Sequence, residues 1–370
     1  SERVMSAAVE LLDSALGIDH DGYQLYVSVR GRTLLDVAGG VAAPGVDMTT
    51  QSITLWFSAG KPVTAVAIAQ LWEAGRLGLD DRVSDHIPAF ANGKQAATIR
   101  HLLIHTGGFP YADDSLHPGP WAEMVASISA APAMFAPGST AAYHGTAAHV
   151  ILAEIVRLVD GRPIEQYAAE EIFTPLGMAS SFVGIAPDRV DELRPRLALI
   201  QDRLPLDGPG HIPGLEFAQF NDVPYLLAVS PGNTCRGPAR ELGILFEALL
   251  GGGARNGARI LQPQTVEAIT ACHRRGMVDQ TFAMNGKQAH PRWGHEYPWG
   301  LGVELDGNGD IGSGNSSRVF ASSGAFSSVG FADPETGLVC VIVTTGLIEL
   351  QRNQDRLAAV ADAVNAAIIA

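Results

Sequence analysis

The chain has 370 residues, of which 46% are hydrophobic and 17% are charged, and its formal net charge is −14. This composition supports a sizeable hydrophobic core and excludes an intrinsically disordered chain. The acidic balance disfavours nucleic acid as a partner, because phosphate groups carry the same sign of charge.

The N-terminal part of the chain predicts a helix, a hairpin and a second helix. Residues 2–16 have an amphipathic pattern with interspersed charges, which is typical of a helix and unlike a signal peptide. Two β-rich runs within residues 23–38 predict a hairpin. Residues 54–74 lead into a helix with Pro62 in its first turn, where the missing N–H costs nothing.

The middle of the chain is predicted to be rich in helices, and the tail returns to strands. Helices are expected at 101–105, 121–130, 147–159, 164–173, 239–250 and 263–271. Residues 185–232 contain many prolines and little periodicity, so we expect them to wrap over a site. Strands are expected at 300–304, 318–322, 328–332 and 339–344, followed by a last helix at 351–368.

β-rich segments therefore lie at both ends of the chain, with helices between them. This order predicts a mixed fold of the α/β (α+β) class, in which both termini form one antiparallel sheet flanked by helices. The chain is expected to be a single domain over residues 1–370. Its α/β part would cover about 1–80 and 232–370, and an inserted all-helical subdomain would cover about 81–231.

A serine and a lysine at the start of the second predicted helix carry the first chemical signal. In Ser58-Ala59-Gly60-Lys61, positions i and i+3 share one helix face, so the hydroxyl and the amine can meet. Serine is a poor nucleophile until a base takes its proton, and lysine can be that base when burial lowers its pKa. Most of the 25 basic residues are arginines, so a chance lysine at this position is unexpected. Taken alone, the pattern fits a surface lysine near a helix start equally well.

Five longer segments resemble one known superfamily. They are LWFSAGKPVTAVAIAQLWEAGRLGLDDRVSDHIPAF, IRHLLIHTGGFP, PLGMASSF, SPGNTCRGPARELGILFEALL and GFADPETGLVCVIVTTG. They are similar to segments of the serine β-lactamase and penicillin-binding-protein superfamily, above all its class C branch with the family VIII carboxylesterases, D-amino-acid-acting peptidases and biosynthetic transacylases. The resemblance covers roughly residues 5–350. It implies a β-lactamase/transpeptidase-like fold and an acyl-enzyme formed on Ser58.

The resemblance assigns a second catalytic residue and shows one departure from the family. Tyr143 stands at the tyrosine of the Tyr-x-Asn motif, which implies that it shuttles protons between Ser58 and the leaving group together with Lys61. A core tyrosine satisfied by burial is the alternative. Gly145 replaces the asparagine that contacts substrate in the family. His144 is a candidate substrate contact in its place, although its position next to Tyr143 should point it elsewhere.

A third motif, Ser322-Ser323-Gly324, stands where the family has Lys-Thr-Gly or His-x-Gly on a core strand. The resemblance implies that this strand binds substrate, with Gly324 allowing close approach. It also implies that the N–H groups of Ser58 and Ala325 form an oxyanion hole. Ser322 is neutral where the family has a cation that helps to bind a carboxylate. This departure argues against β-lactams and peptide C-termini as natural substrates.

The remaining candidates carry weaker signals. Trp299 belongs to an aromatic cluster with Trp293 and Tyr297, which either lines the substrate pocket or packs in the core. His101 and His105 have the i, i+4 spacing of metal-binding helices but lack the glutamate of HExxH, so no metal site is predicted. The three cysteines form no CxxC pair and indicate reduced thiols.

The sequence therefore predicts a serine acyl-transfer enzyme without a cofactor. It is either an ester or amide hydrolase, or a transacylase that passes the acyl group to an amine or alcohol, as in ATP-independent amide formation in natural-product biosynthesis. The expected partners are a small-molecule acyl donor and, for a transacylase, that acceptor. A non-catalytic ligand-binding relative is the alternative. No apolar run reaches the roughly 20 residues that span a bilayer, so no membrane span is expected. A cytoplasmic location is preferred, with a leader that has been trimmed as the alternative.

Overall fold

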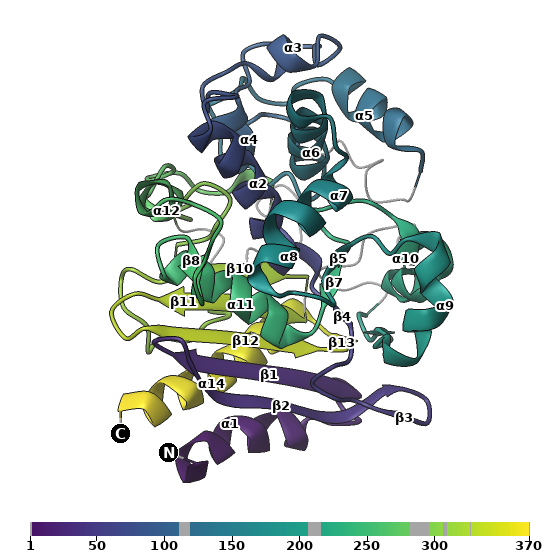
Figure 1. Ribbon diagram of the computed structural model, residues 1–370, viewed down its shortest axis with the longest axis vertical. Helices are drawn as coiled ribbons and strands as arrows, with labels where there is room; N and C mark the ends of the chain where they lie inside the picture. The colour runs from purple at the N-terminus through teal and green to yellow at the C-terminus, as the bar shows by residue number, and fades with distance from the viewer. Residues whose placement is uncertain are drawn as a thin grey trace.

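A six-stranded antiparallel sheet forms the lower half of the molecule in Figure 1 and joins the two ends of the chain. The computed structural model describes residues 2–110, 119–205, 216–281, 296–305, 309–325 and 327–369. In spatial order, the strands are β10 (Phe320–Gly324), β11 (Ser328–Asp333), β12 (Leu338–Thr344), β1 (Gly22–Val29), β2 (Arg32–Ala43) and β3 (Val46–Asp47). β1 pairs with β12, with Leu25 opposite Ile342. This pairing confirms the prediction that both termini build one antiparallel sheet.

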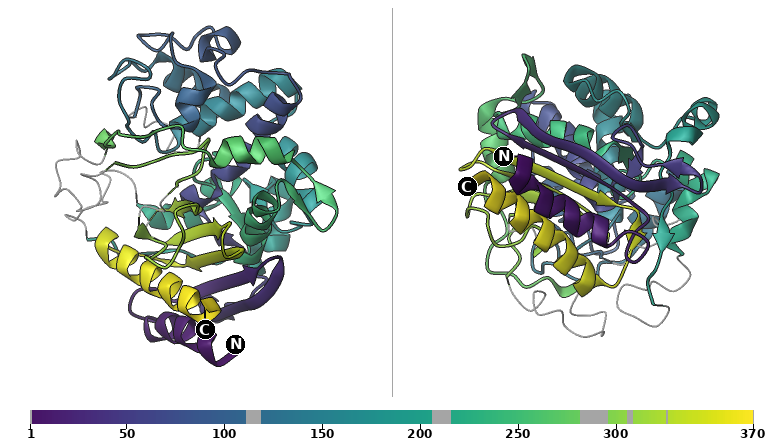
Figure 2. Two further views of the ribbon diagram at one scale, coloured as in Figure 1. Left: turned by 90° about the vertical axis from the view of Figure 1, so that its left-hand side faces the viewer. Right: turned by 90° about the horizontal axis from the view of Figure 1, so that it is seen from below.

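Helices cover both faces of this sheet. α1 (Glu2–Ser14) and α14 (Leu350–Ile369) lie side by side on one face, as the view from below in Figure 2 shows. Their apolar residues pack with Leu25 and Phe331 in one buried cluster. α11 (Ala239–Leu250) packs on the opposite face against β1, β11 and β12. β12 is buried at every position because it is covered from both sides.

Most of the remaining helices form the upper part of the molecule in Figure 1. α2 (Pro62–Glu73) begins beside the sheet, and nearly all of its residues are buried. The other helices are α3 (Val83–His86), α4 (Ile99–Leu103), α5 (Trp121–Ala130), α6 (Ala147–Asp160), α7 (Ile164–Ala168), α8 (Thr174–Leu176), α9 (Val190–Leu193), α10 (Val223–Leu227) and α12 (Pro263–Thr270). A π-helix, Ala169–Phe173, joins α7 to α8. The helix expected at 164–173 is therefore present, but its second half is a π-helix and not an α-helix.

The helical insert also carries strands, which corrects the expectation that it is all-helical. β5 (Phe182–Val183) pairs with β7 (Cys235–Gly237), and β7 also pairs with β4 (Thr54–Leu55). β6 (Gln201–Asp202) pairs with β13 (Gly346–Leu347). These short pairings attach residues of the insert to the α/β part. The boundaries of the insert at about 81 and 231 stay a prediction.

Residues 300–304 do not form the strand that the sequence predicts. Trp299 and Glu304 take part in isolated bridges, to each other and, for Glu304, to Ala321. Gly302 has a φ of +80°, in the left-handed region that favours glycine, so the chain turns back on itself here. The turn places Glu304 against β10. A short hairpin of β8 (Ala254–Arg255) and β9 (Ala258–Arg259) completes the strands of the described residues.

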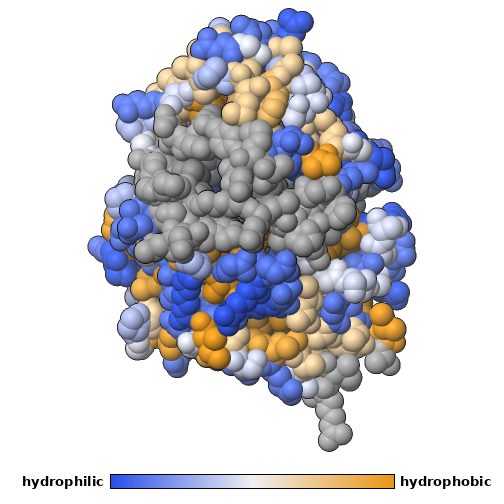
Figure 3. Space-filling view, turned by 180° about the vertical axis from the view of Figure 1, so that it is seen from behind, coloured by the Kyte–Doolittle hydropathy of each residue, from blue (hydrophilic) through white to orange (hydrophobic). Residues whose placement is uncertain are grey.

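Hydrophobic and hydrophilic residues are mixed on the described part of one face of the molecule. Figure 3 shows the face turned away from Figure 1, where hydrophobic residues lie in small patches between hydrophilic ones. Within the described residues, no helix combines the length and the apolar character that a membrane span requires. The cytoplasmic location stays a prediction.

Candidate active site

Ser58 lies in a 3₁₀ turn, Phe57–Gly60, directly before α2. Phe57 has a φ of +50°, a left-handed conformation that costs a residue with a side chain about 1–2 kcal/mol. Aromatic packing holds Phe57 in this conformation: the centroid of its ring lies 5.9 Å from that of Phe217 and 5.2 Å from that of Phe220. The packing therefore fixes the sharp turn that places Ser58 at the start of α2.

Lys61 is buried and lies in hydrogen-bond contact with Ser58. Its Nζ donates to Ser58 Oγ at 2.7 Å and to the backbone carbonyl of Gly232 at 2.7 Å. Burial lowers the pKa of Lys61 to about 7, and the charge of Glu304 partly opposes this shift. A substantial fraction of the amine is therefore neutral near pH 7 and can accept a proton.

Tyr143 also reaches the hydroxyl of Ser58. Its OH donates to Ser58 Oγ at 2.9 Å, and the Lys61 ammonium lies 5.2 Å from the centre of its ring. Burial raises the pKa of the Tyr143 phenol, and the hydrogen bond with Ser58 opposes the shift. The phenol is therefore protonated at neutral pH and can act as a proton donor.

A buried ion pair holds the main chain of Tyr143. Asp279 accepts the Tyr143 N–H at 3.0 Å, and the hydroxyl of Thr281 donates to the Tyr143 carbonyl at 2.9 Å. The second oxygen of Asp279 lies 3.2 Å from Arg274, and both side chains are at most 2% exposed. Arg274 also donates to the carbonyls of Ile104 and Tyr297. The segment 274–281 thus anchors the loop that carries Tyr143.

β10 lies against the nucleophile and is joined to it directly. Ser322 Oγ donates to the backbone carbonyl of Ser58 at 2.9 Å. A Cβ at Gly324 would collide with Ser328 Oγ and with the carbonyl oxygen of Trp56. Glycine is therefore required by the close approach of β10 to the turn before α2. Ala325 follows β10 and packs against the cluster that contains Phe57.

The hydroxyls of the motif 322–324 are engaged by protein groups. Ser323 donates its N–H to Glu304 Oε1 and its hydroxyl to Glu304 Oε2, both at 3.0 Å. The hydroxyl of Ser322 is directed at the Ser58 carbonyl, as described above. These contacts hold β10 against the turn that carries Ser58 and against Glu304.

The structure does not support the predicted substrate contact of His144. This side chain is buried, accepts a hydrogen bond from the Phe109 N–H at 3.2 Å and stacks on His105 with 5.8 Å between centroids. Next to it, Gly145 has a φ of +48°, and a Cβ built there would meet nothing within 4 Å. The position of the family asparagine is therefore open space.

Trp299 is buried in the core. It is 2% exposed and packs edge-on against His105, with 4.5 Å between ring centroids. It lies 6.1 Å from Tyr143. Trp299 therefore packs near the ring of Tyr143. Trp293, from the same predicted cluster, lies outside the described residues.

Two carboxylates of the site were missed by the sequence analysis. Asp279 lies in an irregular segment whose sequence contains no recognisable motif. Glu304 was placed in a predicted strand, where an acidic residue looks like an exposed position. A signal was available only for Glu304: a charged residue inside an otherwise apolar run, GLGVEL, is a candidate for a paired and buried group.

The two histidines with metal-like spacing serve other purposes. His101 closes a capping box at the start of α4 with Thr98, and His105 accepts the N–H of His144. Over the part of the chain that the structure describes, no group of three or more His, Cys, Asp or Glu residues could hold a metal ion.

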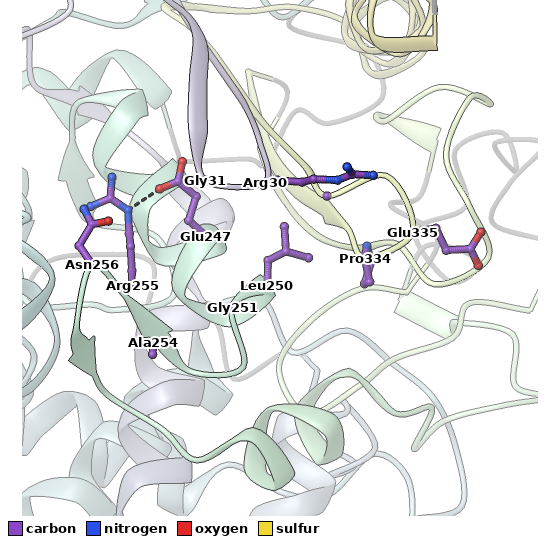
Figure 4. A pocket seen from close by; sticks show the side chains of 11 residues that line it. Arg30, Gly31, Glu247, Leu250, Gly251, Ala254, Arg255, Asn256, Pro334 and Glu335 are labelled. Carbon is purple, nitrogen blue, oxygen red and sulfur yellow. Dashed lines mark hydrogen bonds and ion pairs between the residues drawn. The ribbon is translucent and has the colours of Figure 1, made fainter.

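A separate pocket lies away from these residues (Figure 4). It has a volume of about 440 Å³ and lies between the end of α11, the β1–β2 turn and the β11–β12 turn. Arg255 forms an ion pair with Glu247 at its wall, and Arg30 and Glu335 lie on its other side. None of its lining residues belongs to the Ser58 site.

Comparisons with known proteins show the family to which the chain belongs. The sequence model described as "Beta-lactamase" matches residues 11–365. The chain belongs to the β-lactamase family. It is 27% identical over 350 residues to the esterase/β-lactamase LipL of Mycobacterium tuberculosis, an alignment that covers 88% of this chain and 77% of LipL.

Solved structures of the β-lactamase family have the same fold. A family VIII carboxylesterase superimposes with a TM-score of 0.80 at 23% identity, covering 97% of each chain. EstCE1, described as a hydrolase with promiscuous acyltransferase activity, has a TM-score of 0.78 at 21% identity and covers 98% of this chain and 99% of its own. The family match and the likeness to LipL, and not these structures alone, make the protein an enzyme of the β-lactamase-like serine hydrolase type.

Proposed function

We propose that this β-lactamase-family enzyme transfers acyl groups through an ester formed on Ser58. Neutral Lys61 takes the Ser58 proton as Oγ attacks the carbonyl carbon of an ester or amide. Tyr143 gives its proton to the leaving group as the bond to that group breaks, and then regains a proton from the Lys61 ammonium. The observation that carries the proposal is the double contact of Ser58 Oγ, at 2.7 Å from Lys61 Nζ and 2.9 Å from Tyr143 OH.

The pKa values of the two partners support these separate roles. The pKa of Lys61, about 7, allows the amine to act as the base near neutral pH. The raised pKa of Tyr143 keeps the phenol protonated, so that it acts first as the acid. Two groups with pKa values pushed apart are typical of acid–base catalysis.

We assign the oxyanion hole to the N–H groups of Ser58 and Ala325. The hydrogen bond from Ser322 to the Ser58 carbonyl supports this assignment, because it fixes β10 relative to the nucleophile. Fixed N–H donors stabilise the negative charge of a tetrahedral intermediate without reorganising during the reaction.

The proposed substrates are small esters or amides without a carboxylate beside the scissile bond. Ser322 supplies no positive charge, and Ser323 is hydrogen-bonded to the carboxylate of Glu304. A second carboxylate at this strand would therefore meet a negative charge. Nitrocefin turnover as fast as that of the best ester would contradict this proposal.

The acyl-enzyme is resolved either by water or by an amine or alcohol. The printed descriptions of LipL as an esterase and of EstCE1 as a hydrolase with acyltransferase activity support both outcomes. The retention of Ser58, Lys61 and Tyr143 in mutual contact disfavours a ligand-binding protein without catalysis.

The test is an assay of the full chain with 4-nitrophenyl esters of short and medium-length acids. Mass spectrometry of the products, with and without added amines and alcohols, separates free acid from amide or ester. The wild type should release nitrophenol, and Ser58→Ala should fall to the background rate. A variant Ser58→Ala that is as active as the wild type would disprove the role of Ser58.

A further inference from the structure

His105 occupies the position after α4 at which many helices end on a glycine. The last helical residue is Leu103. The His105 N–H donates to the Leu102 carbonyl at 3.3 Å, and the Thr106 N–H donates to the His101 carbonyl at 2.8 Å. This pair of hydrogen bonds is the Schellman pattern, whose left-handed residue is usually glycine or asparagine. His105 has a φ of +57°. Histidine is disfavoured in this conformation, so its side chain should make contacts that a glycine would lack.

These contacts hold the loop that carries the proposed proton donor. Residues 141–144 have no regular secondary structure. The carbonyl of His105 accepts the Ala142 N–H at 3.0 Å, and its Nδ1 accepts the His144 N–H at 3.3 Å. Tyr143 lies between these two residues, and Asp279 accepts its N–H at 3.0 Å. His105 therefore fixes the main chain on both sides of Tyr143.

Packing fixes the orientation of the His105 ring, and with it the direction of Nδ1. The ring is fully buried. Its centroid lies 4.5 Å from that of Tyr143, with the planes inclined by 51°, and 4.5 Å from that of Trp299, which it meets edge-on. A ring enclosed at this density cannot turn without displacing its neighbours. The acceptor is therefore held towards the loop whose phenol lies 2.9 Å from Ser58 Oγ.

The hydrogen bond from His144 also determines where the His105 ring carries its proton. An N–H donor requires an unprotonated acceptor, so Nδ1 is bare and the neutral ring has its proton on Nε2. Burial lowers the pKa of His105 well below its usual value, which agrees with a neutral ring. His105 can therefore serve as an acceptor at neutral pH and exchanges no proton during the reaction.

We propose that His105 is a positioning residue that holds the phenol of Tyr143 within reach of Ser58 Oγ, through its hydrogen bonds to the main chain on both sides of Tyr143. His105 touches no reacting atom. This inference rests on the proposed function only for the role of Tyr143 as the proton donor. Proton transfer requires hydrogen-bond reach, so a small displacement of the phenol should slow donation to the leaving group.

Two substitutions of His105 separate the acceptor from the ring. His105→Phe keeps an aromatic ring of similar size but has no acceptor. His105→Asn loses the ring but keeps an acceptor at the same place along the side chain, and asparagine tolerates a positive φ. His101→Ala is the matched control, because it removes the capping box of the same helix without changing the contacts of His105. Thermal unfolding verifies that each variant is folded.

The readout is kcat/KM of the full chain for phenyl acetate and for 4-nitrophenyl acetate. Phenolate is the more basic leaving group, so its departure depends more strongly on a donated proton. We expect His105→Phe to lower the value for phenyl acetate about tenfold and that for 4-nitrophenyl acetate only about threefold. His105→Asn should retain at least about a third of the wild-type value for both esters. His101→Ala should lower the melting temperature and leave the ratio of the two values unchanged.

A double-mutant cycle with Tyr143→Phe decides whether His105 acts through the phenol. Once the phenol is absent, adding His105→Phe should lower kcat/KM for phenyl acetate by less than about twofold. The same tenfold loss in both backgrounds would overturn the inference. So would an equal loss in His105→Asn and His105→Phe, or an altered ratio in His101→Ala. A Tyr143→Phe variant as active as the wild type would instead contradict the proposed function.

The tautomer of His105 in the wild type provides the decision if His105→Phe does not fold. Nuclear magnetic resonance of the chain labelled with ¹⁵N-histidine distinguishes bare from protonated ring nitrogens, and the His105 signals are assigned by their loss in His105→Asn. We expect a bare Nδ1 and a proton on Nε2 at pH 7. A proton on Nδ1 would leave the His144 N–H without this acceptor and would overturn the inference.

Discussion

The hydroxyl of Tyr143 donates a hydrogen bond of 2.9 Å to Ser58 Oγ, although the two residues are 85 positions apart in the chain. The turn before α2 carries the nucleophile, and the loop before α6 carries the phenol. The relationship therefore depends on how the helical insert is anchored to the sheet. The predictions below test the groups that maintain it.

Tyr143→Phe should lower kcat/KM for a 4-nitrophenyl ester by about a hundredfold or more, because general acid–base groups contribute on that scale. The ring packing against His105 and Trp299 is retained, so the melting temperature should change little. Steady-state kinetics and thermal unfolding provide both values. A loss below threefold would rule out the phenol as the proton donor.

Asp279→Ala should lower the free energy of unfolding by about 3–5 kcal/mol, because it breaks a buried ion pair with Arg274. Asp80→Ala is the matched control: it removes the ion pair between Arg100 and Asp80, whose carboxylate is 75% exposed, and should cost less than about 1 kcal/mol. Urea denaturation measures both. Equal effects would show that the buried pair does not anchor the Tyr143 loop.

Gly145→Asn should fold with nearly unchanged stability and alter the preference among acyl groups. The position has a φ of +48°, which asparagine tolerates, and the new side chain would enter open space beside Tyr143. Gly324→Ala is the contrasting variant and should lose both stability and activity, because its Cβ collides with backbone and side-chain atoms. Thermal unfolding and an ester panel compare the two. A strongly destabilised Gly145→Asn variant would contradict the finding that the space beside Gly145 is open.

Acidification should destabilise the enzyme between pH 6.5 and about 4. Burial lowers the pKa of His144 to about 3 and that of His20 to about 4, and it lowers that of His149 well below 6.5. The unfolded chain therefore binds more protons in this window, and stability falls as the pH falls through it. Each buried histidine contributes up to about 1.4 kcal/mol per pH unit.

His149→Leu tests this origin of the acid sensitivity. No hydrogen-bond partner of the His149 ring is found among the described residues, so leucine should be tolerated at pH 7. The slope of the unfolding free energy against pH should then become shallower by about 1.4 kcal/mol per pH unit. Urea titrations from pH 7 to 4.5 measure the slope. An unchanged slope would place the acid sensitivity elsewhere.

Local sequence patterns predicted most of the fold because they depend on nearby residues. The bounds of α5 and α11 agree with the prediction to the residue, since clear apolar periodicity and flanking proline or glycine define them. The prediction of a strand at residues 300–304 was wrong. The left-handed conformation of Gly302 turns the chain within an apolar run that otherwise looks like a strand. The short strands of the insert were missed because two-residue pairings leave no periodic pattern.

For the candidate site, too, local sequence patterns were informative and contacts between distant segments were missed. The contact of Ser58 with Lys61 was predicted from their spacing within one turn, and that with Tyr143 from a motif of the resembling family. Glu304 and Asp279 were not found, because their roles arise only when distant segments meet. His144 was given a substrate contact from its neighbourhood in the sequence, whereas the backbone turns its ring into the core.

The central claim is the covalent intermediate on Ser58. The most direct measurement is acid quenching of the enzyme during turnover of an activated ester, followed by intact-mass and peptide mass spectrometry. The wild type should carry the mass of one acyl group in place of one hydrogen, on the peptide that contains Ser58, and Ser58→Ala should carry none. An acyl group on another residue, or equal acylation of Ser58→Ala, would contradict the account.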